Sequence, residues 1–357
     1  MNSRVFVRKG DYTNSLAFIR ETFKTFKDIE FSEGEKVLIY FDGEFDENRN
    51  LSTFPNPVFI EELVRFLLDK GVNVRVGSSV LEKDRNLSDI LENYSVDLVS
   101  FMMEGFEKTK HEKIIIGRER RKVGDHVQRR ILSKIYLPKS FFWADSLIPV
   151  SKIKLHPFFL FSGVIAGVTT LVPSYTRTEL YFYGANLKDF AAGLSEILTI
   201  VKKKVKVSFL DGVEIIQGDE IKGSKFNLNV FISSDDMLSL DSLGSVLVGF
   251  KPSNIPLFTS LSLRHLGIYK LTQMNLKGDY FEELIKHPEP PSLRKLSLFR
   301  KTKFFINRDK CTDCEECLNV CALSAIDLKN YTINNKKCSA CFECFLRCPE
   351  GAIEFKN

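Results

Sequence analysis

Cysteine is absent from the first 310 residues, and all eight cysteines of this 357-residue chain lie in the last 47. An even number of cysteines could indicate disulfide bonds, but these require an oxidising compartment. The N-terminal segment MNSRVFVRKGDYTNS lacks the apolar stretch of a secretory signal. We therefore expect a cytoplasmic protein whose reduced thiols bind metal.

Three common catalytic signatures are also missing from the sequence. There is no phosphate-binding G-x-x-x-x-G-K-[ST], no dinucleotide-binding G-x-G-x-x-G and no serine-nucleophile motif. The histidines at 111, 126, 265 and 287 show no metal-ligand spacing. With 44% hydrophobic and 27% charged residues, the composition is that of a soluble globular protein of two or three domains.

One uncharged stretch, PFFLFSGVIAGVTTLVPSYT at 157–176, is as long as a membrane span. Its two prolines, its glycines and its hydroxyl residues argue against a spanning helix. We expect a buried core segment with a glycine-rich turn, and no membrane span.

The cysteines form two motifs, each with the spacing C-x2-C-x2-C-x3-C. This spacing wraps three thiolates around one 4Fe-4S cluster, and the fourth cysteine, on the following helix, ligates the other cluster. The predicted cofactors are therefore two 4Fe-4S clusters, one on Cys311, Cys314, Cys317 and Cys348 and the other on Cys338, Cys341, Cys344 and Cys321. A pair of zinc sites is the alternative, because C-x2-C also binds zinc.

The repeat extends beyond the cysteines. INRDKCTDCEECLNVCALSAIDL and INNKKCSACFECFLRCPEGAIEF share their first two residues and the Ala-Ile after the last cysteine. We expect Ile306 and Ile333 to start short strands that 326–328 and 353–355 close. The duplicated unit resembles the bacterial two-cluster ferredoxins, apart from Ala322, where that family usually has the proline that Pro349 retains.

The first 300 residues alternate between strand and helix patterns. An apolar strand (36–42), a helix (58–71), a second strand (72–79), a helix and a third strand predict a mostly parallel sheet covered on both faces. Further elements are expected at 186–204 (helix), 206–212 and 226–234 (strands), 237–249 (helix) and 270–279 (strand). The predicted domains are an α/β body (1–287), a linker (288–303) and a small α+β ferredoxin-like domain (304–357).

Several ordered motifs over roughly residues 4 to 280 resemble the domain-of-unknown-function 362 family. They are KVLIYFDG, ADSLIPVSKIKLHPFFLFSGVIAG with its K-x-K-x-H, FLDGVEIIQGDEIKG and SSDDMLSLDSLGSVLVG. The resemblance implies two α/β lobes with a cleft between them, and members often carry a two-cluster ferredoxin module. The chain departs from the family pattern at Tyr40-Phe41-Asp42, Ala166-Gly167 and Asp219-Glu220.

The resemblance also supplies candidate site residues. The catalytic candidates are Lys152, Lys154 and His156, and the substrate-binding candidates are Asp211, Gly212, Asp236 and Asp241. On one extended strand, the two lysines and the histidine would share a side and suit a small anionic substrate. The alternatives are exposed edge lysines, a structural histidine, a turn at Asp211 and an N-cap at Asp236.

Three functions remain open. The clusters could relay electrons to or from a cleft in the body, for example in a reductive reaction. They could belong to an electron carrier whose body only docks a redox partner protein. Third, the clusters could sense redox state in a nucleic-acid-associated protein, since residues 108–134 hold ten basic and three acidic side chains. We expect these side chains to form a solvated β-ribbon or a counter-surface for the acidic cluster domain instead, and so no nucleic acid.

Overall fold

The computed structural model describes most of the chain and divides it into two compact units. The sheet unit comprises 1–106, 138–171 and 197–294, and the cysteine unit comprises 107–137, 172–196 and 295–357. The described residues are 3–42, 45–46, 51–79, 85–94, 96–109, 132, 134–156, 159–183, 187–218, 223–290, 303–321, 323–338, 344–345 and 348–356.

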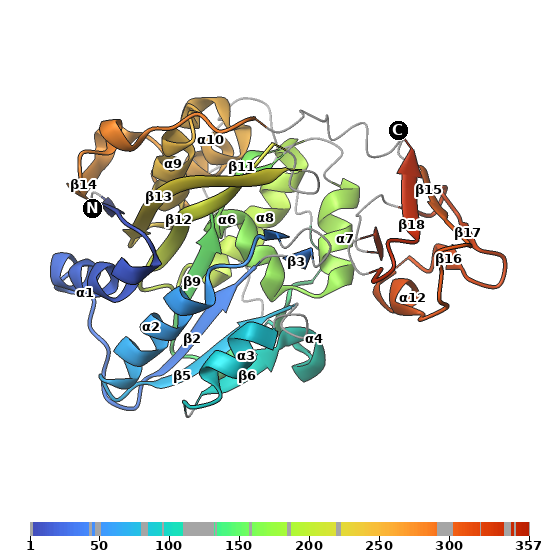
Figure 1. Ribbon diagram of the computed structural model, residues 1–357, viewed down its shortest axis with the longest axis horizontal. Helices are drawn as coiled ribbons and strands as arrows, with labels where there is room; N and C mark the ends of the chain where they lie inside the picture. Colours follow the sequence, from blue (N-terminus) through green and yellow to red (C-terminus); the bar gives the residue numbers. More distant parts are fainter. Residues whose placement is uncertain are drawn as a thin grey trace, which may run out of the picture. The chain divides into compact units, whose positions relative to one another are not determined.

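An eight-stranded sheet forms the centre of the sheet unit (Figure 1). Its strands, in spatial order, are β14 (Met274–Gly278), β1 (Ser3–Lys9), β13 (Ser224–Ser234), β12 (Ser208–Gln217), β9 (Ser146–Lys152), β2 (Lys36–Phe41), β5 (Asn73–Ser78) and β6 (Asp97–Ser100). β13 runs antiparallel to both of its neighbours, whereas every other pair is parallel. The predicted mostly parallel sheet is confirmed.

Helices and short strands complete the described part of the chain. The helices are α1 (Ser15–Thr25), α2 (Pro57–Leu68), α3 (Arg85–Leu91), α4 (Phe101–Glu104), α5 (Lys139–Trp143), α6 (Val164–Gly167), α7 (Ser174–Tyr183), α8 (Leu187–Val201), α9 (Met237–Leu247), α10 (Pro256–Leu263) and α12 (Glu316–Val320). The 3-10 turns are η1 (Tyr12–Asn14), η3 (Val168–Leu171), η4 (Pro252–Asn254), η5 (Leu271–Gln273) and η6 (Phe281–Leu284). The short strand pairs outside the cysteine motifs are β3 (Phe45–Asp46) with β4 (Leu51–Ser52), β7 (Phe106–Lys108) with β8 (Tyr136–Pro138), and β10 (Lys154–His156) with β11 (Leu160–Ser162).

Local sequence signals explain why α2 forms where the periodicity predicts a helix. Asn56 caps its first turn by accepting a hydrogen bond from the Val58 amide, and Pro57 occupies the first helical position. Its buried side chains recur at helical spacing: Phe59, Ile60, Leu63, Val64 and Leu67.

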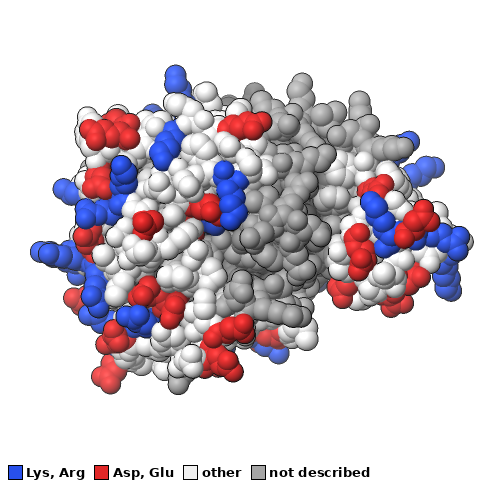
Figure 2. All heavy atoms as spheres, in the orientation of Figure 1, with Lys and Arg blue, Asp and Glu red and all other residues white. Residues whose placement is uncertain are grey.

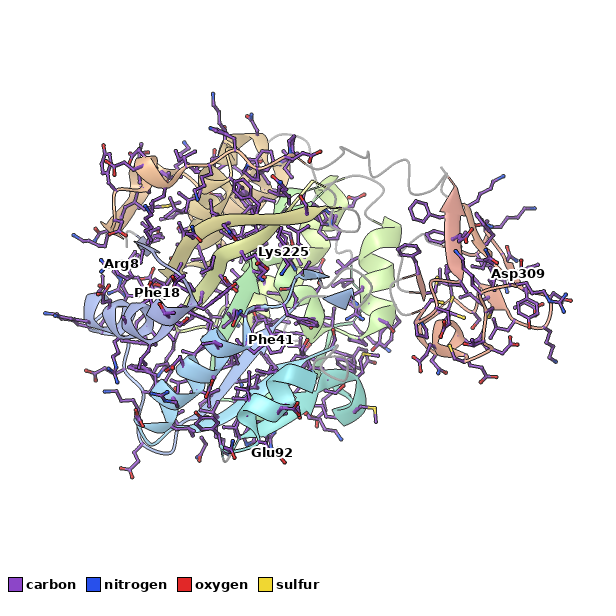
Figure 3. The ribbon with its side chains drawn as sticks, in the orientation of Figure 1. Arg8, Phe18, Phe41, Glu92, Lys225 and Asp309 are labelled. Atoms are coloured by element: carbon purple, nitrogen blue, oxygen red, sulfur yellow. The ribbon has the colours of Figure 1, made fainter. Side chains whose placement is uncertain are left out.

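Aromatic side chains fill the layer between the sheet and helices α1 and α2. Phe18 of α1 stacks on Phe231 of β13 and Phe6 of β1, with ring centroids 5.1 and 5.6 Å apart. Figure 3 shows Phe18 beside α1 and Phe41 in the interior of the unit. Val37, Ile39 and Phe41 of β2 belong to this core, so alternation along the strand turns Tyr40 and Asp42 to the opposite face.

The uncharged stretch does not form one long helix. Its described residues form β11, α6, η3 and the beginning of α7. In the part of the chain that the structure describes, no helix is long and apolar enough to cross a membrane.

The cysteine motifs lie among four short strands. β15 (Lys303–Ile306) pairs with β18 (Ile353–Lys356), and β16 (Ile326–Asp327) pairs with β17 (Thr332–Ile333), both antiparallel. The first strand of each repeat thus pairs with the last strand of the other repeat. Ile306 and Ile333 end their strands, so the prediction that they start them is wrong.

Charged side chains of both signs are interspersed over the described surface of the sheet unit on the face that Figure 2 shows. The basic region 108–134 cannot be placed on any face, because 110–131 and 133 lie outside the described residues.

The aromatic layer should dominate the stability of the sheet unit. We expect Phe18→Ala to lower the free energy of unfolding by about 3–5 kcal/mol, because it removes a fully buried ring and leaves a cavity. Leu263 is 72% exposed, and Leu263→Ala should cost about 0.5 kcal/mol or less. Urea denaturation of both variants measures the difference; equal losses would contradict this account of the core.

Candidate functional site

The strand order reverses between β2 and β9, at the middle of the sheet. From β2 the chain adds β5 and then β6 on one side, and it returns to place β9 on the other side of β2 (Figure 1). Both strands are parallel, so their carboxyl ends meet at one edge. In open α/β sheets, ligands bind outside the carboxyl ends of the strands at such a reversal.

A buried ion pair lies at this edge. Asp42, directly after β2, forms an ion pair with Lys154 of β10 and accepts a hydrogen bond from the Ser151 hydroxyl at 2.6 Å. Lys154 and Ser151 are buried, whereas the Asp42 side chain is 17% exposed. The ion pair neutralises the lysine charge at the position where an anionic substrate was expected.

A second carboxyl group, that of Asp241 in α9, lies on the same side of the sheet. Its two oxygens accept hydrogen bonds from the backbone amides of Val164 and Ile165, both at 2.9 Å. Burial raises the pKa of Asp241 to about 8, and nearby Asp42 adds to this, while the two amides and Lys154 oppose it. Asp241 can therefore gain or lose a proton near neutral pH.

Two glycines give these carboxyl groups their space. A β-carbon on Gly163 would lie 2.4 Å from an Asp241 oxygen, closer than atoms can approach. A β-carbon on Gly167 would lie 3.1 Å from an Asp42 oxygen. Gly163, just before α6, and Gly167, its last residue, thus allow the helix to pack directly on both acids.

Tyr40 of β2 is a third polar residue near Asp42 and Asp241. The side chain is 1% exposed, and its hydroxyl has no hydrogen-bond partner among the described residues. Burial, and then the charges of Asp42 and Asp241, raise the pKa of the phenol. A buried hydroxyl without a partner costs about 1–3 kcal/mol. We call Tyr40, Asp42, Ser151, Lys154 and Asp241 the switch-point cluster.

The K-x-K-x-H segment is not one strand, so the prediction that a single strand aligns its three polar residues is wrong. β9 ends at Lys152, the Ile153 amide donates to the Asp211 carbonyl, and Lys154 and His156 belong to β10. Both lysines are buried, so the alternative of exposed edge lysines is also wrong.

His156 is packed and neutral. Its ring stacks on Phe159 with centroids 4.5 Å apart, and Nδ1 accepts a hydrogen bond from the Phe159 amide at 3.3 Å. Burial, and then the charge of Lys154, lower the pKa of His156 to about 3. At pH 7 the imidazole is therefore uncharged and adds no positive charge to the site.

Asp211 lies on the opposite face of the sheet, with the aromatic layer. Its carboxylate accepts hydrogen bonds from the Tyr12 hydroxyl at 3.2 Å, the Asn56 amide at 2.9 Å and the Val213 amide at 3.1 Å. Gly212 follows within β12, where the register to β13 shifts. The strand continues to Gln217, so Asp211 does not mark its end.

Asp236 caps α9, as the alternative for this residue predicts. Its side chain accepts a hydrogen bond from the Ser239 amide at 2.9 Å, and it also contacts the Lys202 ammonium at 3.3 Å.

Seven residues of the α/β body were predicted as site residues, and the structure places two of them, Lys154 and Asp241, in the switch-point cluster. The other three members, Tyr40, Asp42 and Ser151, were not predicted. Tyr40 and Asp42 could have been found, because they are polar residues at alternate positions where an apolar strand ends.

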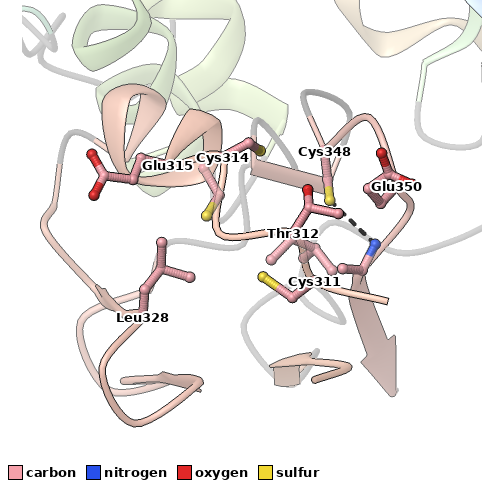
Figure 4. Close-up of a pocket in the computed structure, with 10 residues that line it drawn as sticks. Cys311, Thr312, Cys314, Glu315, Leu328, Cys348 and Glu350 are labelled. Atoms are coloured by element: carbon pink, nitrogen blue, oxygen red, sulfur yellow. Dashed lines mark hydrogen bonds between the residues drawn. The ribbon is translucent and has the colours of Figure 1, made fainter. Parts of the chain in front are cut away.

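In the cysteine unit, four cysteines line one pocket (Figure 4). They are Cys311, Cys314, Cys317 and Cys348, three from the first motif and the last from the second. Burial, and then Cys348 with Cys311 and Cys314, raise the pKa of Cys317 to about 11. Positive charge beside Cys317, such as that of a bound metal, would favour its thiolate.

The fourth cysteines of the two motifs have matching surroundings. The Ala325 amide donates to Cys321 Sγ at 3.3 Å, and the Ala352 amide donates to Cys348 Sγ at 3.2 Å. Cys338 and Cys344 pack against the same small core, and Cys341 lies outside the described residues. Within the described ranges, no three His, Cys, Asp or Glu side chains are placed to hold a single metal ion.

Comparison with known proteins gives a family match and a distant structural likeness. No curated protein matches the chain. The structure of the lactate racemase apoprotein from Thermoanaerobacterium thermosaccharolyticum is 16% identical over 68% of this chain, with a TM-score of 0.39. The match spans 57% of that protein's length.

A family match covers most of the sheet unit. Residues 41–245, more than half of the chain, match the family described as "Domain of unknown function (DUF362)". This range includes two of the motifs that resemble the family in full, most of SSDDMLSLDSLGSVLVG and the end of KVLIYFDG. It also includes all of the switch-point cluster except Tyr40. The chain belongs to the DUF362 family.

Proposed function

We propose that this protein transfers electrons through two 4Fe-4S clusters, held by a ferredoxin-like domain in residues 304–357. The observation that carries the proposal is the pocket that gathers Cys311, Cys314 and Cys317 with Cys348 from the other motif. A single x2-x2-x3 motif cannot supply four ligands to one cubane, so each half borrows its fourth cysteine from the other.

The contacts around the pocket support the same proposal. β15 pairs with β18, which brings the start of the first repeat to the end of the second and so places Cys348 near the first motif. The two matching N–H···S bonds reflect the duplication. Hydrogen bonds of this kind stabilise the charge on a ligating sulfur and help to set its cluster's potential.

The residues of the domain have clear roles toward such clusters. The thiolates would hold them, while Phe304, Ile306, Ile326 and Ile353 form an apolar core beside the ligands and restrict access of water. Bound clusters would supply the capacity to accept and release single electrons. We place such a protein in the cytoplasm, with a redox partner protein as its electron donor or acceptor.

For the sheet unit we propose that electrons serve a reductive reaction at the carboxyl edge of β2 and β9. The strand reversal and the polar switch-point cluster support a site there. The ion pair between Lys154 and Asp42 leaves little net positive charge, which weakens the case for an anionic substrate.

A second candidate is an electron carrier whose sheet unit only docks a partner. It is favoured by the burial of Lys154, whose charge is already taken up by Asp42. No described contact supports a nucleic-acid function, since most of the basic region lies outside the described residues.

The crossed ligand sets can be tested by counting iron in paired variants. Cys348→Ala should remove one cluster, about four iron atoms per chain. Adding Cys311→Ala should remove no further iron, because both residues serve the same cluster. Adding Cys338→Ala instead should remove nearly all of it. If Cys348→Ala with Cys311→Ala empties both sites, the ligand sets are not crossed.

The two functions can be separated on anaerobically purified protein. Whether the protein is a reductive enzyme or an electron carrier, dithionite should bleach its visible absorption and produce the electron paramagnetic resonance signal of reduced clusters. Native mass spectrometry should then find a bound small molecule if the sheet unit is catalytic, and two clusters alone if the protein is a carrier. Zinc in place of iron, with no reducible absorption, would refute electron transfer.

A further inference from the structure

Tyr40 carries a buried hydroxyl that has no hydrogen-bond partner in the part of the chain that the structure describes, although two carboxyl groups lie nearby. Burial and the charges of Asp42 and Asp241 raise the pKa of its phenol, but it forms a hydrogen bond with neither carboxyl group. Buried polar groups are normally satisfied, by protein or by ordered water. A further hydrogen-bonding group beside the phenol would therefore satisfy it.

Water has the right size and bonding capacity to be that group. A buried water typically makes about three hydrogen bonds to groups that would otherwise be unsatisfied. The Tyr40 hydroxyl and the two carboxyl groups offer three partners. Asp42 is partly exposed and gives the water a route for proton exchange with solvent.

We propose that Tyr40, Asp42, Lys154 and Asp241 form a proton-exchange site, in which a bound water bridges the phenol and the two carboxyl groups. The acceptor it serves is a neutral carbonyl or imine group at the carboxyl edge of β2 and β9. An anion is disfavoured there, because Asp42 already neutralises the Lys154 ammonium.

Proton transfer through the site balances as follows. The Asp241 O–H bond breaks and its proton passes to the water, a proton of the water passes to the Tyr40 oxygen, and the phenol proton passes to the acceptor. The carboxylate left on Asp241 is stabilised by the Val164 and Ile165 amides and by Lys154. A proton from solvent, delivered through Asp42, then restores Asp241.

Few other groups can titrate inside the cluster. Asp241 is the only ionisable residue of α9, and α6, β11 and α10 contain none. The strands β12, β13 and β1, which also contact α9, do carry ionisable side chains: Asp211, Glu214, Lys225, Arg4, Arg8 and Lys9. Asp211 is bonded to Tyr12 on the opposite face, and Glu214 forms an ion pair with Lys225. The groups that face Asp241 are Asp42 and Tyr40 at the end of β2 and Lys154 of β10. A pH effect that disappears with Asp241 can thus be assigned to this site.

The sign of the pH effect follows from the raised pKa of Asp241. Folded protein keeps a proton up to about pH 8 that the unfolded chain releases near 3.8. This contribution to stability is complete below the pKa of Asp241 in the unfolded chain. It is lost as pH rises toward the pKa of Asp241 in the folded protein. Between pH 5 and 8, the parent's folding equilibrium constant should fall relative to that of Asp241→Asn by up to about tenfold per pH unit.

Thermal and denaturant unfolding of the full chain at several pH values tests the proposal. Tyr40→Phe should move the midpoint of this fall to higher pH, because the Asp241 carboxylate loses a donor relayed by the water. Tyr12→Phe is the matched control: its phenol donates to Asp211 on the opposite face of the sheet. That variant should leave the midpoint of the fall assigned to Asp241 unchanged.

If stability depends on pH in the same way in the parent and in Asp241→Asn, the proposed site is wrong. If Asp241→Asn does not fold, the test is the comparison of Tyr40→Phe with Tyr12→Phe. If the two variants show the same dependence of stability on pH, Tyr40 is not part of the site. A high-resolution crystal structure should show a water bonded to the Tyr40 hydroxyl and a carboxyl oxygen; a direct phenol–carboxyl bond would exclude the bridge. The catalytic role depends on the proposed electron transfer, but these readouts do not involve the clusters.

Discussion

The ion pair between Lys154 and Asp42 joins β10 to the end of β2, and its two charges lie largely out of water. Transfer of charged groups from water is expensive, and removing one partner of a buried pair typically costs about 3–5 kcal/mol. The Ser151 hydroxyl adds a bond to Asp42, and the amides of α6 serve Asp241. Four segments distant in sequence are therefore held in one arrangement, at the point where the strand order reverses.

Local patterns predicted the parts of the fold that local interactions determine. The apolar run at 36–42, the periodic helix at 58–71 and the strand at 72–79 correspond to β2, α2 and β5 within a few residues. The cap at Asp236 also followed from its position before an apolar helix. Each of these signals is a short-range preference that tertiary contacts did not override.

The site could be predicted only in part, because its geometry depends on strand order. Nothing in the segment SKIKLH reveals that Ile153 bonds to Asp211 of β12 and divides the segment into two strands. Asp42 belongs to a segment in which the sequence departs from the family pattern, yet in the structure it forms an ion pair with Lys154, a predicted site residue. That pairing required β9 to lie beside β2, which the sequence does not indicate. The cysteine motifs differ, since their spacing itself restricts which sulfurs can meet.

The two faces of the sheet show how the same residue types can serve different ends. On one face, Tyr12 donates to Asp211, whose carboxylate also accepts two backbone amides, so every group is satisfied and the contact stabilises the fold. On the other face, Tyr40 lies near Asp42 and Asp241, and its hydroxyl forms no hydrogen bond with any described residue. Replacing its hydroxyl with hydrogen would remove that cost, so stability alone does not account for a tyrosine at this position. Unsatisfied groups of this kind concentrate where a protein binds or transfers something, because they can be satisfied by a ligand instead of by the fold.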